Sequence, residues 1–145
     1  MRVFIKICVI LTSLLCVFSC EKDKVEMEIA TFVVSGTAYD IESGDPLSNI
    51  TVHLMGYPDD DYKMEKNPVC SETAYTDLQG KYKITVIRPS AKKYFKILAQ
   101  DKYLYRDTTS YQSSLKYLYI GDGTAYNERT KTYELKDIDF YLNKN

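Results

Sequence analysis

The sequence has no tryptophan, one histidine and four cysteines, and it has no excess of basic residues. Its 145 residues carry 19 Lys and Arg against 20 Asp and Glu, and no segment gathers Lys and Arg into a stripe. This balance argues against nucleic acid as a partner, because such proteins contact phosphates with a basic surface. The scarcity of His and Cys also leaves few groups for acid–base or metal chemistry. We therefore expect no cofactor and a protein that is not an enzyme.

Residues 1–19 have the layout of an export signal. Arg2 and Lys6 give a positive start, and 7–18 is an almost continuous apolar run. A transmembrane helix needs about 20 apolar residues, so this run is short for a permanent span and fits a cleaved signal. The four residues VFSC that end at Cys20 resemble the lipobox of bacterial lipoproteins, in which cleavage precedes a cysteine that then carries lipid. The alternative is an ordinary secretory signal that is cleaved elsewhere.

The lipobox resemblance implies that residues 1–19 are removed and that Cys20 attaches the chain to a membrane through lipid. Cys70 is then left without a cysteine partner, because the other two cysteines lie in the signal. The charged residues 20–30 form a tether, and their first part, 21–24, resembles the surface-export signal of Bacteroidota lipoproteins. We expect an outer-membrane lipoprotein of the cell envelope, exposed on the cell surface.

From residue 31 onward, short β-branched or aromatic runs alternate with turn residues. In one run Ile50, Val52 and Leu54 share a face, which is the period of two that is typical of a strand. No amphipathic helix of about ten residues or more begins with a capping signal. About seven short strands predict an all-β fold, a single antiparallel β-sandwich over residues 31–143. The expected strands are 31–40, 49–55, 72–76, 81–87, 94–99, 115–120 and 132–142.

Two turns carry specific backbone chemistry. Gly44 permits a positive φ angle, and Pro46 presets φ for entry into the next strand. In the second turn Asp77 can accept a hydrogen bond from the backbone two residues on, and Gly80 lets the turn close. Tyr82 then begins the inward face of its strand. These residues predict where the chain reverses direction.

The same segments resemble the carboxypeptidase regulatory-like domain, a transthyretin-like and Ig-like β-sandwich. The resemblance rests on three runs: VSGTAYD at 34–40, GDPLSNITV at 44–52 and YTDLQGKY at 75–82. It covers about residues 32–87, and it implies a structural or binding module of the kind found on surface receptors and lipoproteins. Its motifs consist of turn residues, so they indicate the fold and say little about function.

The loop 56–69 is acidic, with the consecutive residues Asp59, Asp60 and Asp61. Calcium takes six to eight oxygen ligands from such loops. Consecutive Asp residues, however, point in different directions and lack the spacing of a calcium-binding loop. The sequence therefore leaves two alternatives, a calcium site and a solvated loop.

Tyrosine is abundant, with 14 residues in the chain. Tyr117 and Tyr119 share one face of a predicted strand, and an exposed pair could stack on a sugar or on a partner protein. The alternative is a sheet surface in which the rings are half-buried.

Asp107-Thr108-Thr109 matches a short O-glycosylation motif of Bacteroidota, with Thr108 as the acceptor.

His53 lies on the face opposite Ile50 and Leu54, with no His or Cys nearby in the sequence. A nucleophile–base pair would require a hydroxyl or thiol close to it in space, which the sequence alone does not show.

These observations favour a non-enzymatic, lipid-anchored protein that binds or supports another envelope protein or a glycan. The alternative function is a carbohydrate- or calcium-binding surface protein, or a small surface enzyme, that uses the Tyr-rich face and the acidic loop.

Overall fold

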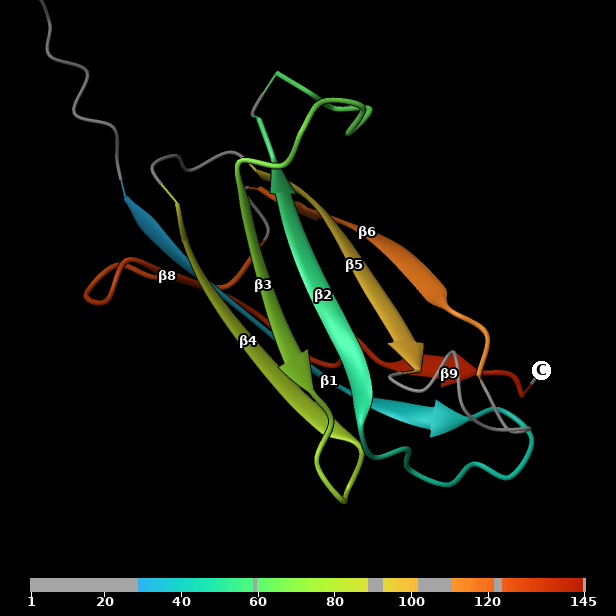
Figure 1. Cartoon of the computed structure of the whole chain (residues 1–145). Helices are drawn as coiled ribbons and strands as arrows, with labels where there is room; N and C mark the ends of the chain where they lie inside the picture. The colour runs from blue at the N-terminus through green and yellow to red at the C-terminus, as the bar shows by residue number, and fades with distance from the viewer. Residues whose placement is uncertain (1–28, 59, 89–92, 102–110, 122–123, 145) are drawn as a thin grey trace, which may run out of the picture.

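The computed structural model describes residues 29–58, 60–88, 93–101, 111–121 and 124–144. They form two β-sheets that pack face to face (Figure 1). No helix in these ranges is long and apolar enough to span a membrane. The predicted all-β sandwich is confirmed.

The first sheet has the strand order β4-β1-β8-β7, with β9 also paired to β1, and the second has the order β3-β2-β5-β6. The nine strands of the described residues are β1 (Ala30–Asp40), β2 (Ile50–Tyr57), β3 (Cys70–Tyr75), β4 (Lys81–Arg88), β5 (Lys93–Asp101), β6 (Ser114–Ile120), β7 (Tyr126–Asn127), β8 (Thr132–Leu135) and β9 (Phe140–Leu142).

The core lies between the two sheets and is built from alternate residues of their strands. Strand β4 alternates strictly between exposed and buried positions. In β2 the predicted face of Ile50, Val52 and Leu54 is buried to 2% exposure or less. The rings of Phe32 and Phe95, from opposite sheets, lie 5.3 Å apart between centroids. Burial of one such side chain stabilises the fold by roughly 1.5–3 kcal/mol.

Both predicted turns have the expected geometry. Gly44 and Gly80 adopt φ angles of 76° and 70°. The Oδ1 atom of Asp77 accepts hydrogen bonds from the backbone N–H groups of Gln79 at 2.9 Å and Lys81 at 2.8 Å. Because these bonds are local, they could be predicted from the residues of the turn alone.

The predicted last strand, 132–142, is divided in two by the structure. β8 and β9 both pair with β1 in the parallel direction, whereas every other named pair is antiparallel. Val34 pairs with Leu135, but Ala38 pairs with Phe140, so this segment contains one residue more than β1 and forms a bulge.

The bulge is held by three contacts of its backbone and side chains. Ile138 N–H donates to the Ser35 carbonyl at 3.1 Å, and the buried Tyr82 hydroxyl donates to the Ile138 carbonyl at 2.6 Å. Asp139 Oδ1 accepts from the N–H of Thr37 at 2.7 Å. A single regular strand was the wrong prediction here because these bonds come from residues far away in the sequence.

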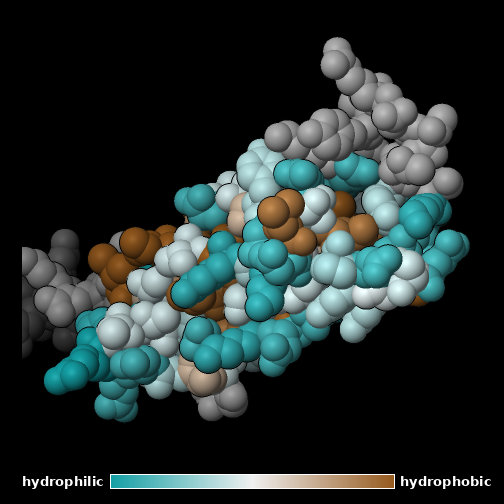
Figure 2. Space-filling view, turned by 90° about the horizontal axis from the view of Figure 1, so that it is seen from below, coloured by the Kyte–Doolittle hydropathy of each residue, from teal (hydrophilic) through white to brown (hydrophobic). Residues whose placement is uncertain are grey.

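One end of the molecule carries the turn between β3 and β4 and the connection between β1 and β2 (Figure 1). Seen from this end, the surface is mainly hydrophilic, and hydrophobic residues form separate patches (Figure 2). On the outward face of the β3-β2-β5-β6 sheet, aromatic and polar side chains lie side by side, as in the cross-strand pair of Lys96 and Tyr117.

Candidate functional site

Tyr117 and Tyr119 project from the outward face of β6, as the alternation predicts, and are 61% and 59% exposed. β6 lies at the end of its sheet, next to β5. Tyr119 is paired with Tyr94 across the two strands, and their ring centroids lie 5.2 Å apart. The three rings form a tyrosine platform on the outward face, defined here as Tyr94, Tyr117 and Tyr119.

Lys96 lies beside the platform, paired with Tyr117 across the strands. Its ammonium group lies 4.9 Å from the ring centroid of Tyr57 and 5.7 Å from that of Tyr117. It also donates a hydrogen bond to the Met64 carbonyl at 2.7 Å. Lys96 therefore connects the acidic loop to the outward sheet face, because cation–π contacts and a hydrogen bond hold its head group.

The acidic loop uses its carboxylates to hold its own backbone. Asp61 is 5% exposed, and its two oxygens accept hydrogen bonds from the N–H groups of Glu65 at 3.1 Å and Lys66 at 2.8 Å. Asp60 forms an exposed ion pair with Lys66 at 2.7 Å, and this contact lowers the pKa of Asp60. Asp59 lies outside the described residues.

These contacts bear on the calcium hypothesis. Both oxygens of Asp61 face backbone N–H groups of the loop. Within the part of the chain that the structure describes, no group of three or more His, Cys, Asp or Glu side chains is placed to hold a metal ion. The observed role of the described carboxylates is to order the loop.

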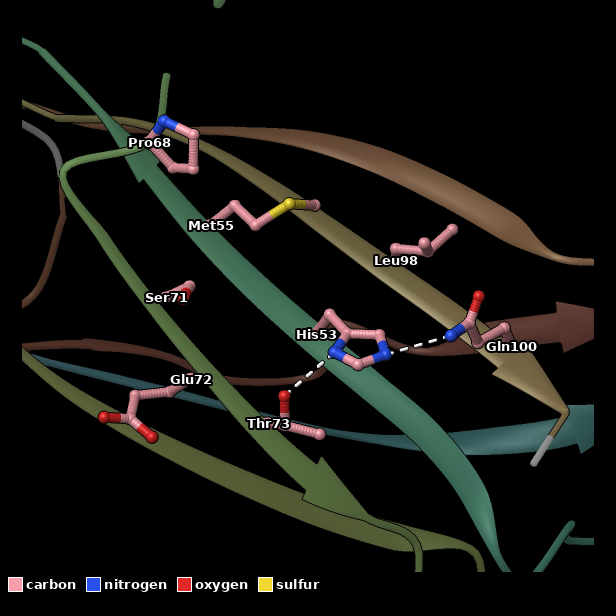
Figure 3. A pocket seen from close by; sticks show the side chains of 8 residues that line it. All are labelled: His53, Met55, Pro68, Ser71, Glu72, Thr73, Leu98 and Gln100. Atoms are coloured by element: carbon pink, nitrogen blue, oxygen red, sulfur yellow. Dashed lines mark hydrogen bonds between the residues drawn. The ribbon is translucent and has the colours of Figure 1, made fainter.

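A shallow cavity of about 390 Å³ lies on the same outward face, over β3, β2 and β5 (Figure 3). His53 from β2 lies in its centre, with Thr73 from β3 on one side and Gln100 from β5 on the other (Figure 3). Met55, Pro68 and Leu98 supply apolar surface, and Ser71 and Glu72 complete the lining. We call this cavity the histidine pocket.

The imidazole of His53 is held by hydrogen bonds at both nitrogens. Nδ1 lies 2.8 Å from Thr73 Oγ1, and Nε2 lies 3.0 Å from Gln100 Nε2. An amide nitrogen can only donate, so His53 Nε2 is an acceptor in this arrangement. A neutral imidazole then carries its proton on Nδ1 and donates to Thr73 Oγ1. The sequence indicated only that His53 faces outward, because its two partners come from other strands.

A second polar cluster lies at the far end of β1, around Asp40, which is 2% exposed. Its Oδ2 atom accepts from Lys144 at 2.7 Å and from the Tyr111 hydroxyl at 3.1 Å. Its Oδ1 atom accepts from the N–H of Glu42 at 2.8 Å. The bond from Lys144 is the largest of the causes that lower the pKa of Asp40 to about 2. This cluster ties the end of the chain to β1.

The remaining predicted sites divide into described and undescribed residues. Cys20 and Thr108 lie outside the described residues, so their predicted lipidation and glycosylation stay predictions. Cys70 is half-buried on β3 and packs against the core. The role of Lys96, Thr73 and Gln100 was not foreseen, since nothing in their local sequence pattern sets them apart.

No family model matches the sequence, and no curated protein is significantly similar to it. Solved structures do resemble it in fold. A 3-chlorocatechol 1,2-dioxygenase from Rhodococcus opacus superposes with a TM-score of 0.55 at 12% identity, over 84% of this chain and 63% of that one.

Two further structures have similar scores. The dioxygenase domain of a dioxygenase carbohydrate-binding protein fusion from Streptomyces has a TM-score of 0.52 at 15% identity, over 83% of this chain and 84% of that one. Catechol 1,2-dioxygenase from Acinetobacter has a TM-score of 0.51 at 13% identity, over 84% of this chain and 55% of that one. The chain thus spans less than two thirds of the two catechol dioxygenases, and the likeness shows a shared β-sandwich fold.

This finding corrects one expectation. The sequence led us to expect a protein that is not an enzyme, but several of its structural neighbours are dioxygenases. The expectation, which was drawn from the composition of the chain, is wrong, because a sandwich of this kind is also a scaffold for enzymes. At this level of identity, neither the reaction nor the substrate of those enzymes transfers to this chain.

Proposed function

We propose that this protein is an envelope lipoprotein whose outward β3-β2-β5-β6 face binds a glycan. The observation that carries the proposal is the tyrosine platform of Tyr94, Tyr117 and Tyr119, two rings of which are more than half exposed on an edge strand. Lys96 and the histidine pocket continue this face with polar groups.

The chemistry of the platform suits a sugar. A tyrosine ring offers a large apolar surface with few rotatable bonds, and its hydroxyl can stay in water. A pyranose presents C–H groups on the faces of its ring and hydroxyls around its edge, so it can stack on the ring and still use polar neighbours. The packing of Tyr94 against Tyr119, at 5.2 Å between centroids, limits the freedom that binding would otherwise remove.

The membrane part of the proposal rests on the sequence. The VFSC run that ends at Cys20 and the charged residues after it resemble a lipoprotein signal and tether. The turn motifs at 44–52 and 75–82, which resemble the carboxypeptidase regulatory-like domain, fit a surface module of this kind. Stable anchoring needs more than one acyl chain, because each buried methylene contributes about 0.8 kcal/mol and a single chain is marginal.

A glycan array followed by calorimetric titration tests the binding. The wild-type protein is expected to bind at least one glycan class, and Tyr117→Ala to bind it about tenfold more weakly, a loss of about 1.4 kcal/mol. The matched control is Tyr141→Ala, since Tyr141 is 57% exposed but lies on β9, in the other sheet. Wild-type protein that binds no glycan, or equal losses in the two variants, would overturn the proposal.

Anchoring is tested separately by Cys20→Ala in the full chain. The wild-type protein is expected in the membrane fraction after labelling with a fatty acid, and the variant unlabelled and either unprocessed or released. Membrane retention and labelling that do not change in the variant would show that Cys20 is not the anchor.

A further inference from the structure

We infer that the histidine pocket is a subsite for one neutral sugar residue of the glycan, oriented by Thr73 and Gln100. This inference rests on the proposed function, because it names the part of the same face that selects the ligand. The pocket brings together residues of three strands: Thr73 and His53 are 20 positions apart in the sequence, and His53 and Gln100 are 47 apart.

The size and lining of the pocket fit a small polar ligand with an apolar face. Its volume of about 390 Å³ falls in the usual range for ligand sites, about 300–1,000 Å³. Met55 and Leu98 provide an apolar surface next to His53, while Thr73 and Gln100 provide polar groups on either side (Figure 3). A pyranose has the same two properties, since its ring face is apolar and its edge carries hydroxyls.

The hydrogen bonds of His53 determine what the pocket offers a ligand. Gln100 Nε2 donates to the imidazole at 3.0 Å, so the amide oxygen is turned away from the ring and can accept. Thr73 Oγ1 receives the Nδ1 proton at 2.8 Å, so the hydroxyl proton of Thr73 is directed elsewhere and can donate. The pocket thus presents one acceptor, the Gln100 amide oxygen, and one donor, the Thr73 hydroxyl.

A sugar hydroxyl can both donate and accept, so two hydroxyls of one ring satisfy this pair without a charge on the ligand. The side chain of Glu72 lies on the face of β3 opposite to Thr73, because neighbouring strand residues alternate, and it points away from His53 (Figure 3). None of the described residues that line the pocket is Lys or Arg, so a ligand carboxylate would find no cationic partner there. The pocket therefore favours a neutral sugar over an acidic one.

The pocket and the tyrosine platform are adjacent. His53, Leu98 and Leu115 form one row across β2, β5 and β6, and Met55, Lys96 and Tyr117 form the next row. Neighbouring strands lie about 4.8 Å apart, so Tyr117 and Met55 are separated by roughly 10 Å across the sheet. One short oligosaccharide can therefore stack on the platform and place another of its residues in the pocket.

The single histidine of the chain makes a direct test possible. In protein with isotope-labelled histidine, only His53 in the folded body gives imidazole signals by NMR. We would titrate the full chain with glucose, galactose, mannose, N-acetylglucosamine and glucuronate. At least one neutral sugar is expected to shift the His53 signals in a saturable way, with glucuronate weaker than glucose.

Two variants remove the polar partners one at a time. Gln100→Leu removes the acceptor, and Thr73→Val removes the donor with little change in shape. Each variant is expected to bind the sugar about fivefold more weakly or worse, because a polar group of the sugar is left without its partner. Gln79→Leu is the matched control, since Gln79 is exposed in the turn between β3 and β4, and it should bind like the wild type. Circular dichroism of each variant checks that the fold is intact.

The outcomes separate this inference from the proposed function. If the array shows binding that depends on Tyr117 while no sugar moves the His53 signals, the pocket inference is overturned and the platform stands. If a neutral sugar shifts the His53 signals and both pocket variants bind that sugar more weakly, the pocket inference is supported even where Tyr117→Ala has no effect. Equal affinity in the wild type and both pocket variants, or a preference for glucuronate, overturns the inference.

Discussion

Gly36 offers a sharp test of the bulge between β8 and β9. A Cβ atom built on Gly36 would collide with the backbone carbonyl of Ile138. Ile138 cannot move away easily, because its N–H donates to the Ser35 carbonyl at 3.1 Å and its carbonyl accepts from the Tyr82 hydroxyl at 2.6 Å. We therefore predict that Gly36→Ala lowers the free energy of unfolding.

The sign of the effect distinguishes this reasoning from a general rule. Alanine in place of glycine inside a strand ordinarily stabilises by roughly 0.5–1 kcal/mol, since glycine loses more freedom on folding. A forced overlap in a packed site costs about 1–3 kcal/mol. Because the added Cβ meets the Ile138 backbone and not the end of a flexible side chain, the upper part of this range, about 2–3 kcal/mol, applies. Subtracting the gain leaves an expected net loss of about 1–2.5 kcal/mol, measured by urea unfolding followed by circular dichroism.

A double-mutant cycle with Tyr82→Phe tests the cause. The Tyr82 hydroxyl holds the Ile138 carbonyl in place, so removal of the hydroxyl should let the backbone of the bulge shift. Gly36→Ala should then destabilise the protein less, with a coupling free energy between the two substitutions of about 0.5 kcal/mol or more. Gly44→Ala is the matched control, because Gly44 has a φ of 76° and no atom within 4 Å of an added Cβ. Its cost should simply add to that of Tyr82→Phe. Gly36→Ala as stable as the wild type, or additive with Tyr82→Phe, would refute the argument.

Three further predictions concern pH and the acidic loop. Folding lowers the pKa of Asp40 from 3.8 to about 2, and the largest cause is the hydrogen bond from Lys144. The contribution of Asp40 to stability is therefore complete above pH 4 and is lost as the pH falls from about 4 to 2. Asp40→Asn should flatten that part of the pH–stability curve. Burial raises the pKa of Tyr82 above its usual 10, so the contribution of Tyr82 to stability is complete below pH 10 and is lost above it. Tyr82→Phe should reduce this loss of stability at alkaline pH and should destabilise the protein by about 1 kcal/mol at neutral pH. Asp61→Ala should destabilise by about 1–3 kcal/mol and speed proteolysis of the loop, because two backbone N–H groups lose a carboxylate, whereas Asp60→Ala, which breaks an exposed ion pair, should change stability by less than about 1 kcal/mol.

The strands and turns that depend on local pattern could be predicted from the sequence. The buried face of Ile50, Val52 and Leu54 follows from alternation, and the turns at Gly44 and Gly80 follow from the backbone freedom of glycine. The exposure of Tyr117 and Tyr119 follows from the same alternation, while a ligand-binding role for them stays a prediction. Alternation and turn chemistry act over a few residues, and a single sequence displays both.

The candidate site depends on contacts that no local pattern contains. Lys96 meets Tyr117 because β5 and β6 pair in a particular register. The expectation that the protein is not an enzyme failed for a related reason, since it was drawn from composition alone and took no account of the proteins that share this fold.

By itself, the amino-acid sequence determined the class of fold, the turns and the buried faces of β2 and β4, because these depend on side-chain period and on the φ angles of a few residues. Only the tertiary structure decided that β8 and β9 run parallel to β1 around a bulge, and that His53 lies between Thr73 and Gln100. The physical reason is that the packing of the two sheets against each other sets the register between distant strands. This packing depends on all of the strands together, so no short segment of the sequence determines the register.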